Sequence, residues 1–103
     1  MLPLIAERRS EIDALCRRFQ VRRLDMFGSA ARGDFDPARS DIDFLVEFAA
    51  REDDLGQFLD FKEALETLLA RPVDLVDRKA VQDSRNYIRK RHILTGAEPV
   101  YAA

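Results

Sequence analysis

Two aspartates stand two positions apart at the start of an alternating segment, where they could hold a divalent cation. Asp41 and Asp43 lie on one face of residues 41–48, and the apolar side chains at 42, 44, 46 and 48 lie on the other. Two ionised carboxylates this close repel each other, and a bound cation, a shared proton or a salt bridge to Arg32 or Arg39 relieves the repulsion. Mg²⁺ typically takes one or two carboxylates together with substrate phosphates and waters. The spacing therefore predicts a metal site or, as the plainer alternative, a structural ion pair.

A Gly-Ser pair precedes the two aspartates and could bind phosphate. Gly28 and Ser29 end a short strand candidate at 24–27. Glycine lets the backbone approach a phosphate closely, and a serine that caps a short helix adds a hydroxyl and unpaired N–H groups. Alone, the pair fits an ordinary strand-to-helix turn equally well, but the downstream aspartates favour a phosphate cradle.

A third carboxylate comes from a later strand candidate, residues 73–76. Asp74 lies inside this segment and Asp77 directly follows it. On a regular strand these two side chains point to opposite faces, so both cannot line one site unless the strand ends between them. Arg78 and Lys79 follow, either within reach of a triphosphate or as exposed residues at a helix start.

Periodicity places these residues on a framework of helices and strands. Apolar spacing of three, four and seven predicts helices at about 3–20, 55–69 and 81–95, with a short edge strand in the tail at 98–101. In the middle helix Leu55, Phe58 and Leu59 belong to the predicted apolar stripe, whereas Phe61 falls outside it, so Phe58 or Phe61 is a candidate partner contact. The order predicts an α+β, two-layer fold: a small mixed sheet packed against helices on one face, with the other face free for a site.

Composition narrows the class of protein. A chain of 103 residues, 47% hydrophobic and 35% charged, predicts a single domain spanning 1–103. A net charge of -2 gives no overall attraction to nucleic acid, so direct nucleic-acid binding is not expected. The absence of an apolar run of about 20 residues and an early charged N-terminus predict a cytoplasmic protein without a membrane segment. The single cysteine, Cys16, lies on an apolar stripe and is expected to pack.

The motifs resemble one known signature. Residues 28–33, Gly-Ser-Ala-Ala-Arg-Gly, followed by Ser-Asp-Ile-Asp-Phe-Leu-Val at 40–46, are similar to the signature of the DNA polymerase β-like nucleotidyltransferase superfamily, and most of all to its minimal nucleotidyltransferases. The family pattern is Gly-Ser, a linker of about ten residues, Asp-x-Asp and a later acidic residue; this chain has eleven linker residues, 30–40. The resemblance favours Asp74 over Asp77 as the third carboxylate and leaves Asp77 as a helix cap.

The resemblance implies transfer of a nucleoside monophosphate, with AMP from ATP the expected case, to a hydroxyl acceptor. It implies two Mg²⁺ ions, or Mn²⁺ in their place, with Asp74 also helping to deprotonate the acceptor. The implied catalytic residues and metal ligands are Asp41, Asp43 and Asp74, and the implied nucleotide-binding residues are Gly28, Ser29 and Arg32.

The resemblance also implies a partner. Minimal nucleotidyltransferases usually pair with a helical HEPN (higher eukaryotes and prokaryotes nucleotide-binding) protein, often an RNase toxin, which the antitoxin silences by adenylylating a tyrosine. The alternative is an antitoxin that only binds and masks its partner. A third hypothesis is transfer to a small molecule such as an aminoglycoside, in a cleft built by dimerisation. The base of the triphosphate, the acceptor and a homo- or hetero-oligomeric state stay open.

Overall fold

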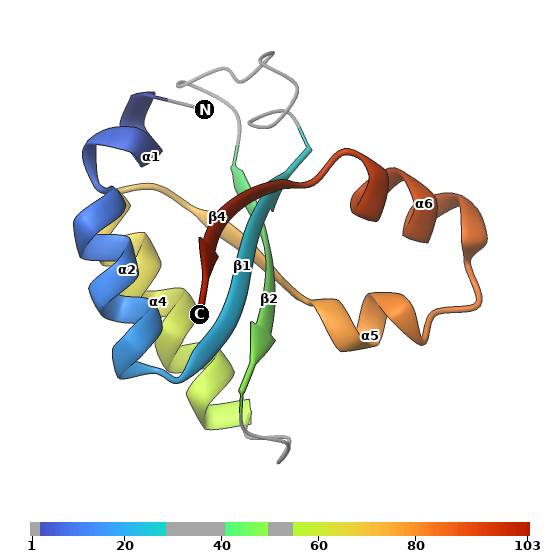
Figure 1. Ribbon diagram of the computed structural model, residues 1–103, viewed down its shortest axis with the longest axis horizontal. Helices are drawn as coiled ribbons and strands as arrows, with labels where there is room; N and C mark the ends of the chain where they lie inside the picture. The colour runs from blue at the N-terminus through green and yellow to red at the C-terminus, as the bar shows by residue number, and fades with distance from the viewer. Residues whose placement is uncertain (1–2, 29–40, 50–54) are drawn as a thin grey trace.

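A computed structural model describes residues 3–28, 41–49 and 55–103 of the chain. These residues form a small sheet between two unequal groups of helices (Figure 1). In chain order, the elements are α1 (Pro3–Glu7), α2 (Arg9–Arg18), β1 (Val21–Phe27), β2 (Ile42–Phe48), α4 (Leu55–Leu69), β3 (Val73–Asp77), α5 (Arg78–Gln82), α6 (Tyr87–Thr95) and β4 (Glu98–Ala102). The predicted short helix after Ser29 and the predicted loop at 33–40 lie outside the described residues.

Four strands of the described residues form one mixed sheet in the order β3-β2-β1-β4. The β1 strand runs antiparallel to both β2 and β4, whereas β2 and β3 run parallel. The end of β1 therefore lies beside the starts of β2 and β3. This row of strand ends is called the sheet edge below. The α+β class and the small mixed sheet packed against helices are confirmed, as is the tail strand, which joins the sheet as β4 beside β1.

One face of the sheet carries the main core. Helices α1, α2 and α4 cover this face (Figure 1), and the alternation of β2 sends Ile42, Phe44 and Val46 into it. Cys16 packs there too and is fully buried, as expected. The other buried members of this cluster are Ile5, Ile12, Val21, Leu24, Met26, Phe61, Leu65, Leu69, Val73, Leu75 and Val100.

The other face is less open than predicted. Leu45, on the same face of β2 as Asp43, is fully buried, and it forms a second cluster with Val81 of α5 and Ile93 of α6. The prediction of a wholly free face was therefore wrong over this part of the sheet. The short helices cover its middle because Leu45 offers them an apolar anchor.

Two predicted helices are each divided in two. The first breaks at Arg8, whose N–H bonds to the Ile5 carbonyl at 3.2 Å, three residues back rather than four. The last breaks between Gln82 and Tyr87, where the Ser84 hydroxyl accepts the Asn86 N–H at 3.1 Å. A serine side chain that bonds to nearby backbone competes with a continuous helix, and Asn86 then accepts the Lys90 N–H at 3.0 Å as α6 begins.

The apolar stripe of α4 also differs from the predicted one. Phe61 is fully buried together with Leu65 and Leu69, whereas Leu55 and Leu59 are 69% and 51% exposed. The ring of Phe61 meets that of Phe19 at 5.6 Å and that of Phe48 at 5.9 Å between centroids. Phe61 is therefore a core residue, and its prediction as a partner contact was wrong. Spacing alone did not show which row of α4 faces these rings.

No described helix has both the length and the apolar character needed to cross a membrane.

Candidate active site

Asp43 and Asp74 are neighbours across two parallel strands. They are register partners between β2 and β3, and on its other side Asp43 pairs with Phe27 of β1. Adjacent strands lie about 4.8 Å apart, and laterally paired residues point to the same face. Residues that are 31 positions apart in the sequence are thus brought together at the edge where β1 ends. This juxtaposition follows from the parallel pairing of the two strands.

Gly28 approaches the Asp43 carboxylate directly. Its φ of +69° lies in the left-handed region, and a Cβ built there would lie 3.2 Å from Asp43 Cγ and 3.5 Å from Asp43 Cβ, with Oδ2 closer still. Only glycine fits this position without moving the carboxylate. The predicted role of Gly28 was approach to a phosphate; the described contact is with the second aspartate of the motif.

Asp41 is exposed and precedes β2, which begins at Ile42. The Ile42 N–H donates to the Pro72 carbonyl at 3.2 Å, so β2 and β3 start at the same level of the sheet. This places Asp41 at the rim of the edge that holds Asp43 and Asp74. Of the three predicted carboxylates, the register brings two side by side and leaves the third at their border.

These side chains suit a hard cation in their chemistry. Carboxylate oxygens are the protein ligands that Mg²⁺ takes, and it completes its shell with phosphates and waters. Among residues 3–28, 41–49 and 55–103, no three His, Cys, Asp or Glu side chains stand close enough to form a metal cluster. The fit therefore rests on the Asp43–Asp74 pair, and Asp41 would have to turn toward the pair to join it.

Asp77 caps a helix and is not part of the carboxylate pair. It is the N-cap of α5, and its carboxylate accepts the Lys79 N–H at 3.0 Å. Asp74, by contrast, is exposed on β3 beside Asp43. The prediction of Asp77 as a helix cap is confirmed. Ser29 and Arg32, the remaining predicted nucleotide-binding residues, lie outside the described residues.

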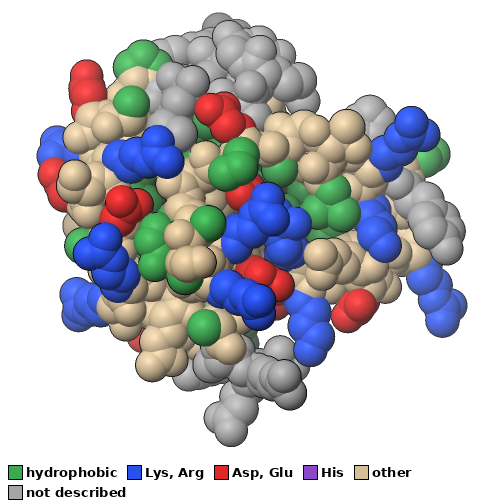
Figure 2. Space-filling view, viewed as in Figure 1, with side chains coloured by type: hydrophobic (Ala, Val, Ile, Leu, Met, Phe, Trp, Pro, Cys, Tyr) green, Lys and Arg blue, Asp and Glu red, His purple; other side chains and the backbone are tan. Residues whose placement is uncertain are grey.

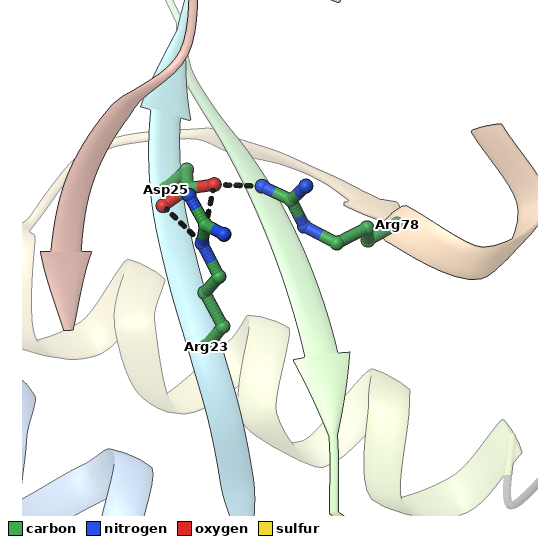
Figure 3. A network of polar contacts seen from close by, with 3 residues as sticks. All are labelled: Arg23, Asp25 and Arg78. Atoms are coloured by element: carbon green, nitrogen blue, oxygen red, sulfur yellow. Dashed lines mark hydrogen bonds and ion pairs between the residues drawn. The ribbon is translucent and has the colours of Figure 1, made fainter. Parts of the chain in front are cut away.

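A buried ion pair lies next to this edge and was not predicted. Asp25 of β1 is fully buried, and its carboxylate contacts the guanidinium groups of Arg23 and Arg78 (Figure 3). Arg23 Nε lies 3.1 Å from each of the two carboxylate oxygens, and a terminal nitrogen of Arg78 donates to Oδ2. A carboxylate between apolar Leu24 and Met26 was the available signal, because a buried charge needs a partner.

Arg78 itself is buried, so it is not an exposed residue at a helix start, the second of the two alternatives considered for it. Burial, and after it the positive charge of Arg23, lower the pKa of Arg78 from its ordinary value. Its Nε is buried and has no hydrogen-bond partner within the described parts of the chain. A buried guanidinium with one donor unsatisfied is held in place chiefly by its carboxylate.

Basic side chains are also gathered on the surface. In Figure 2, Lys and Arg gather over the middle of the viewed face and again along the two short helices. Arg22 and Arg23 of β1 are exposed, as are Lys79 of α5 and Arg91 of α6. Such a face favours anionic ligands or partners locally, although the chain as a whole is slightly acidic.

The family model for the nucleotidyltransferase domain matches residues 9–95 of this chain. The match spans the candidate carboxylates, the sheet edge that holds them and the helices on both faces. The chain belongs to this nucleotidyltransferase family, and it is a nucleotidyltransferase by homology.

Relatives narrow the class. The chain is 40% identical over 68 residues to protein adenylyltransferase MntA of Thermococcus cleftensis, covering 66% of this chain and 67% of that protein. A solved structure described as a minimal nucleotidyltransferase has a TM-score of 0.77 at 33% identity, covering 95% of this chain and 94% of that one. The chain is therefore a minimal nucleotidyltransferase and a homologue of protein adenylyltransferase MntA.

Two further solved structures share the fold at lower identity. One is a toxin–antitoxin complex with AMP-PNP, with a TM-score of 0.69, 23% identity and coverage of 92% and 73% of the two chains. The other is a tri-AMPylated Shewanella oneidensis HEPN toxin in complex with its MNT antitoxin, with a TM-score of 0.64, 20% identity and coverage of 96% and 73%.

Proposed function

We propose that this chain transfers AMP from ATP to a hydroxyl of a HEPN protein, with a tyrosine as the acceptor side chain, and thereby silences that protein as its antitoxin. The observation that carries the proposal is the Asp43–Asp74 pair at the sheet edge, with Gly28 closed against it. The 40% identity to a protein adenylyltransferase supports the type of acceptor.

The proposed reaction is a substitution at the α-phosphorus of ATP. The acceptor oxygen forms a bond to this phosphorus, the bond to the β-phosphate oxygen breaks, and pyrophosphate leaves. In this proposal Asp74 receives the hydroxyl proton; its exposure, which makes it accessible to an acceptor, supports this role. Asp43 lies beside it between β1 and β3, and Gly28, which has no side chain, leaves room for the Asp43 carboxylate next to the end of β1.

Two Mg²⁺ ions, or Mn²⁺ in their place, are the proposed cofactor, held by Asp43 and Asp74 and joined by Asp41. When bound, such ions orient the triphosphate and neutralise charge on the attacking and leaving oxygens. Ser29 and Arg32 are proposed to bind the phosphates, as the family motif implies. The acidic edge needs this cation charge, since ATP would otherwise meet like charges.

The test is label transfer from α-labelled ATP. The purified chain is incubated with Mg²⁺ and the HEPN protein of the same genome, and label on that protein is measured. Asp43→Asn should abolish labelling because it removes one ligand while keeping the side-chain size. Asp60→Asn on α4, an exposed aspartate away from the sheet edge, is the matched control and should label normally.

The same experiment separates transfer from masking. If neither the wild type nor any variant labels the HEPN protein, and Asp43→Asn still silences it, the chain acts by binding alone and the transfer proposal is wrong. If the label appears and disappears with Asp43, the transfer proposal stands. Measuring RNase activity of the HEPN protein in parallel makes both outcomes visible.

A further inference from the structure

Two rows of residues cross the same face of the sheet next to each other. The first row, Phe27, Asp43 and Asp74, is the candidate site. The second row, two residues along each strand, is Asp25, Leu45 and Val76. Two residues along a strand correspond to roughly 6 to 7 Å. The buried carboxylate of Asp25 therefore lies in the row next to the site, on the same face of the sheet.

Arg78 connects the two ends of this second row. It is the first residue of α5, two positions after Val76, and its guanidinium reaches across β2 to Asp25 on β1 (Figure 3). Arg23 binds the same carboxylate, but from β1 itself, so it joins no separate elements. The Arg78–Asp25 pair thus spans three strands, whereas the Arg23–Asp25 pair stays within one.

The strand that carries Asp74 needs such a tie. In the sheet order β3 is an outer strand, paired to β2 alone among the described strands. It has five residues, and its start is held by Glu66 of α4, which accepts the Val73 N–H at 3.1 Å. Arg78 holds the opposite end. The two contacts bracket Asp74, and they come from opposite faces of the sheet.

We propose that Arg78 is a positioning residue, which acts through Asp25 to fix β3 against β1 and so sets the distance between the Asp74 and Asp43 carboxylates. The proposal rests on the proposed function, because it takes these two carboxylates as metal ligands. A hydrophobic pair of similar volume would fill the same space, but it would not define the position of an edge strand as a charged hydrogen bond does.

The test compares variants that separate folding from positioning. Arg78→Met removes the contact across strands, and Arg23→Met removes the contact within β1. The double variant Asp25→Leu, Arg78→Met replaces the buried ions by apolar groups, which restores stability in many proteins. Arg78→Lys keeps the charge. Each variant is measured by thermal unfolding, by Mn²⁺ titration without nucleotide using electron paramagnetic resonance, and by kcat and KM of label transfer.

Arg78→Met should weaken Mn²⁺ binding and lower kcat by about 10-fold, the usual cost of losing support around a metal site. Arg78→Lys should recover part of this loss, and Arg23→Met should bind Mn²⁺ as the wild type does. The double variant should regain the unfolding temperature but not the Mn²⁺ affinity. That separation is the signature of positioning, because a purely structural role would restore both together.

Two outcomes would overturn the inference while leaving the proposed function intact. One is an Arg78→Met protein that unfolds earlier yet binds Mn²⁺ and turns over like the wild type. The other is a double variant that recovers both properties. The proposed function fails separately, if the Asp43→Asn variant binds Mn²⁺ as tightly as the wild type does.

Discussion

Gly28 and Asp43 are in such close contact that a methyl group on Gly28 would enter the Asp43 carboxylate. The contact joins Gly28, the turn residue that follows β1, to Asp43, the second residue of β2. Because Asp43 in turn pairs with Asp74, a side chain at position 28 would disturb the carboxylate pair. A motif glycine that is expected to admit a phosphate therefore also makes room for a carboxylate in this chain.

Replacing Gly28 by alanine should destabilise the chain and impair transfer beyond that loss. The left-handed φ costs an L-residue about 1 to 2 kcal/mol, and the new Cβ would displace Asp43. Urea unfolding measures the first effect, and label transfer at a temperature where the variant is fully folded measures the second. Gly56→Ala, at an exposed helical position of α4, is the control and should be neutral or stabilising. Full transfer by folded Gly28→Ala would contradict the expected displacement.

Asp74 and Asp77 should respond in opposite ways. Asp74→Asn should leave the free energy of unfolding unchanged, because the side chain is exposed, and should lower transfer by at least about 100-fold if it holds the acceptor proton. Asp77→Ala should cost about 1 kcal/mol through loss of the α5 cap. Asp77→Asn keeps a good capping side chain and should be nearly silent. Loss of transfer in Asp77→Asn with full transfer in Asp74→Asn would exchange the two roles.

Glu66 should make stability depend on pH in the acid range. The hydrogen bond from the Val73 N–H, and after it Lys62, lower the pKa of Glu66 from its ordinary value. A lowered carboxylate pKa stabilises the fold above the ordinary glutamate pKa of about 4.3, and this stability is lost as the pH falls through the lower folded-state pKa. Glu66→Gln should flatten this part of the stability curve in urea titrations from neutral to acid pH. An unchanged acid slope would show that Glu66 does not hold the start of β3.

Cys16 should be inert in the folded chain and should weaken it at alkaline pH. Burial, and after it the charge of Asp13, raise the pKa of the thiol to about 12. The unfolded thiol ionises near pH 8.5, so its stabilising effect is complete below that pH and is lost as pH rises towards 12. Thiol reagents at pH 8 should label the unfolded chain far faster than the native one. Cys16→Ala should show a flatter decline in stability between pH 9 and pH 10, and equal slopes would contradict the assignment.

The local parts of the fold followed from local patterns. The alternation of residues 41–48 predicted which side chains of β2 enter the core, and the acidic residue after 73–76 was rightly expected to cap a helix. The breaks near Arg8 and Ser84 were missed, because apolar periodicity continues across both. Periodicity also misplaced Phe61, since the choice between neighbouring rows depends on the rings of Phe19 and Phe48, which come from other elements.

The candidate site was only partly within reach of the sequence. The motif and the family resemblance selected Asp43 and Asp74, but their pairing depends on the parallel register of strands that are far apart in the chain. The Asp25–Arg78 contact joins residues 53 positions apart and has no local signature beyond an aspartate inside an apolar strand. Such contacts appear only once the strand order is known.

Adenylyl transfer can be tested by comparing two labels on ATP. The chain and the HEPN protein of the same genome are incubated with Mg²⁺ and ATP labelled at either the α- or the γ-phosphate. If the chain is an adenylyltransferase, the HEPN protein should take up label from α-labelled ATP alone, and this label should be lost with Asp43→Asn and kept with Asp60→Asn. Label from γ-labelled ATP, or silencing of the HEPN protein without any label, would contradict it.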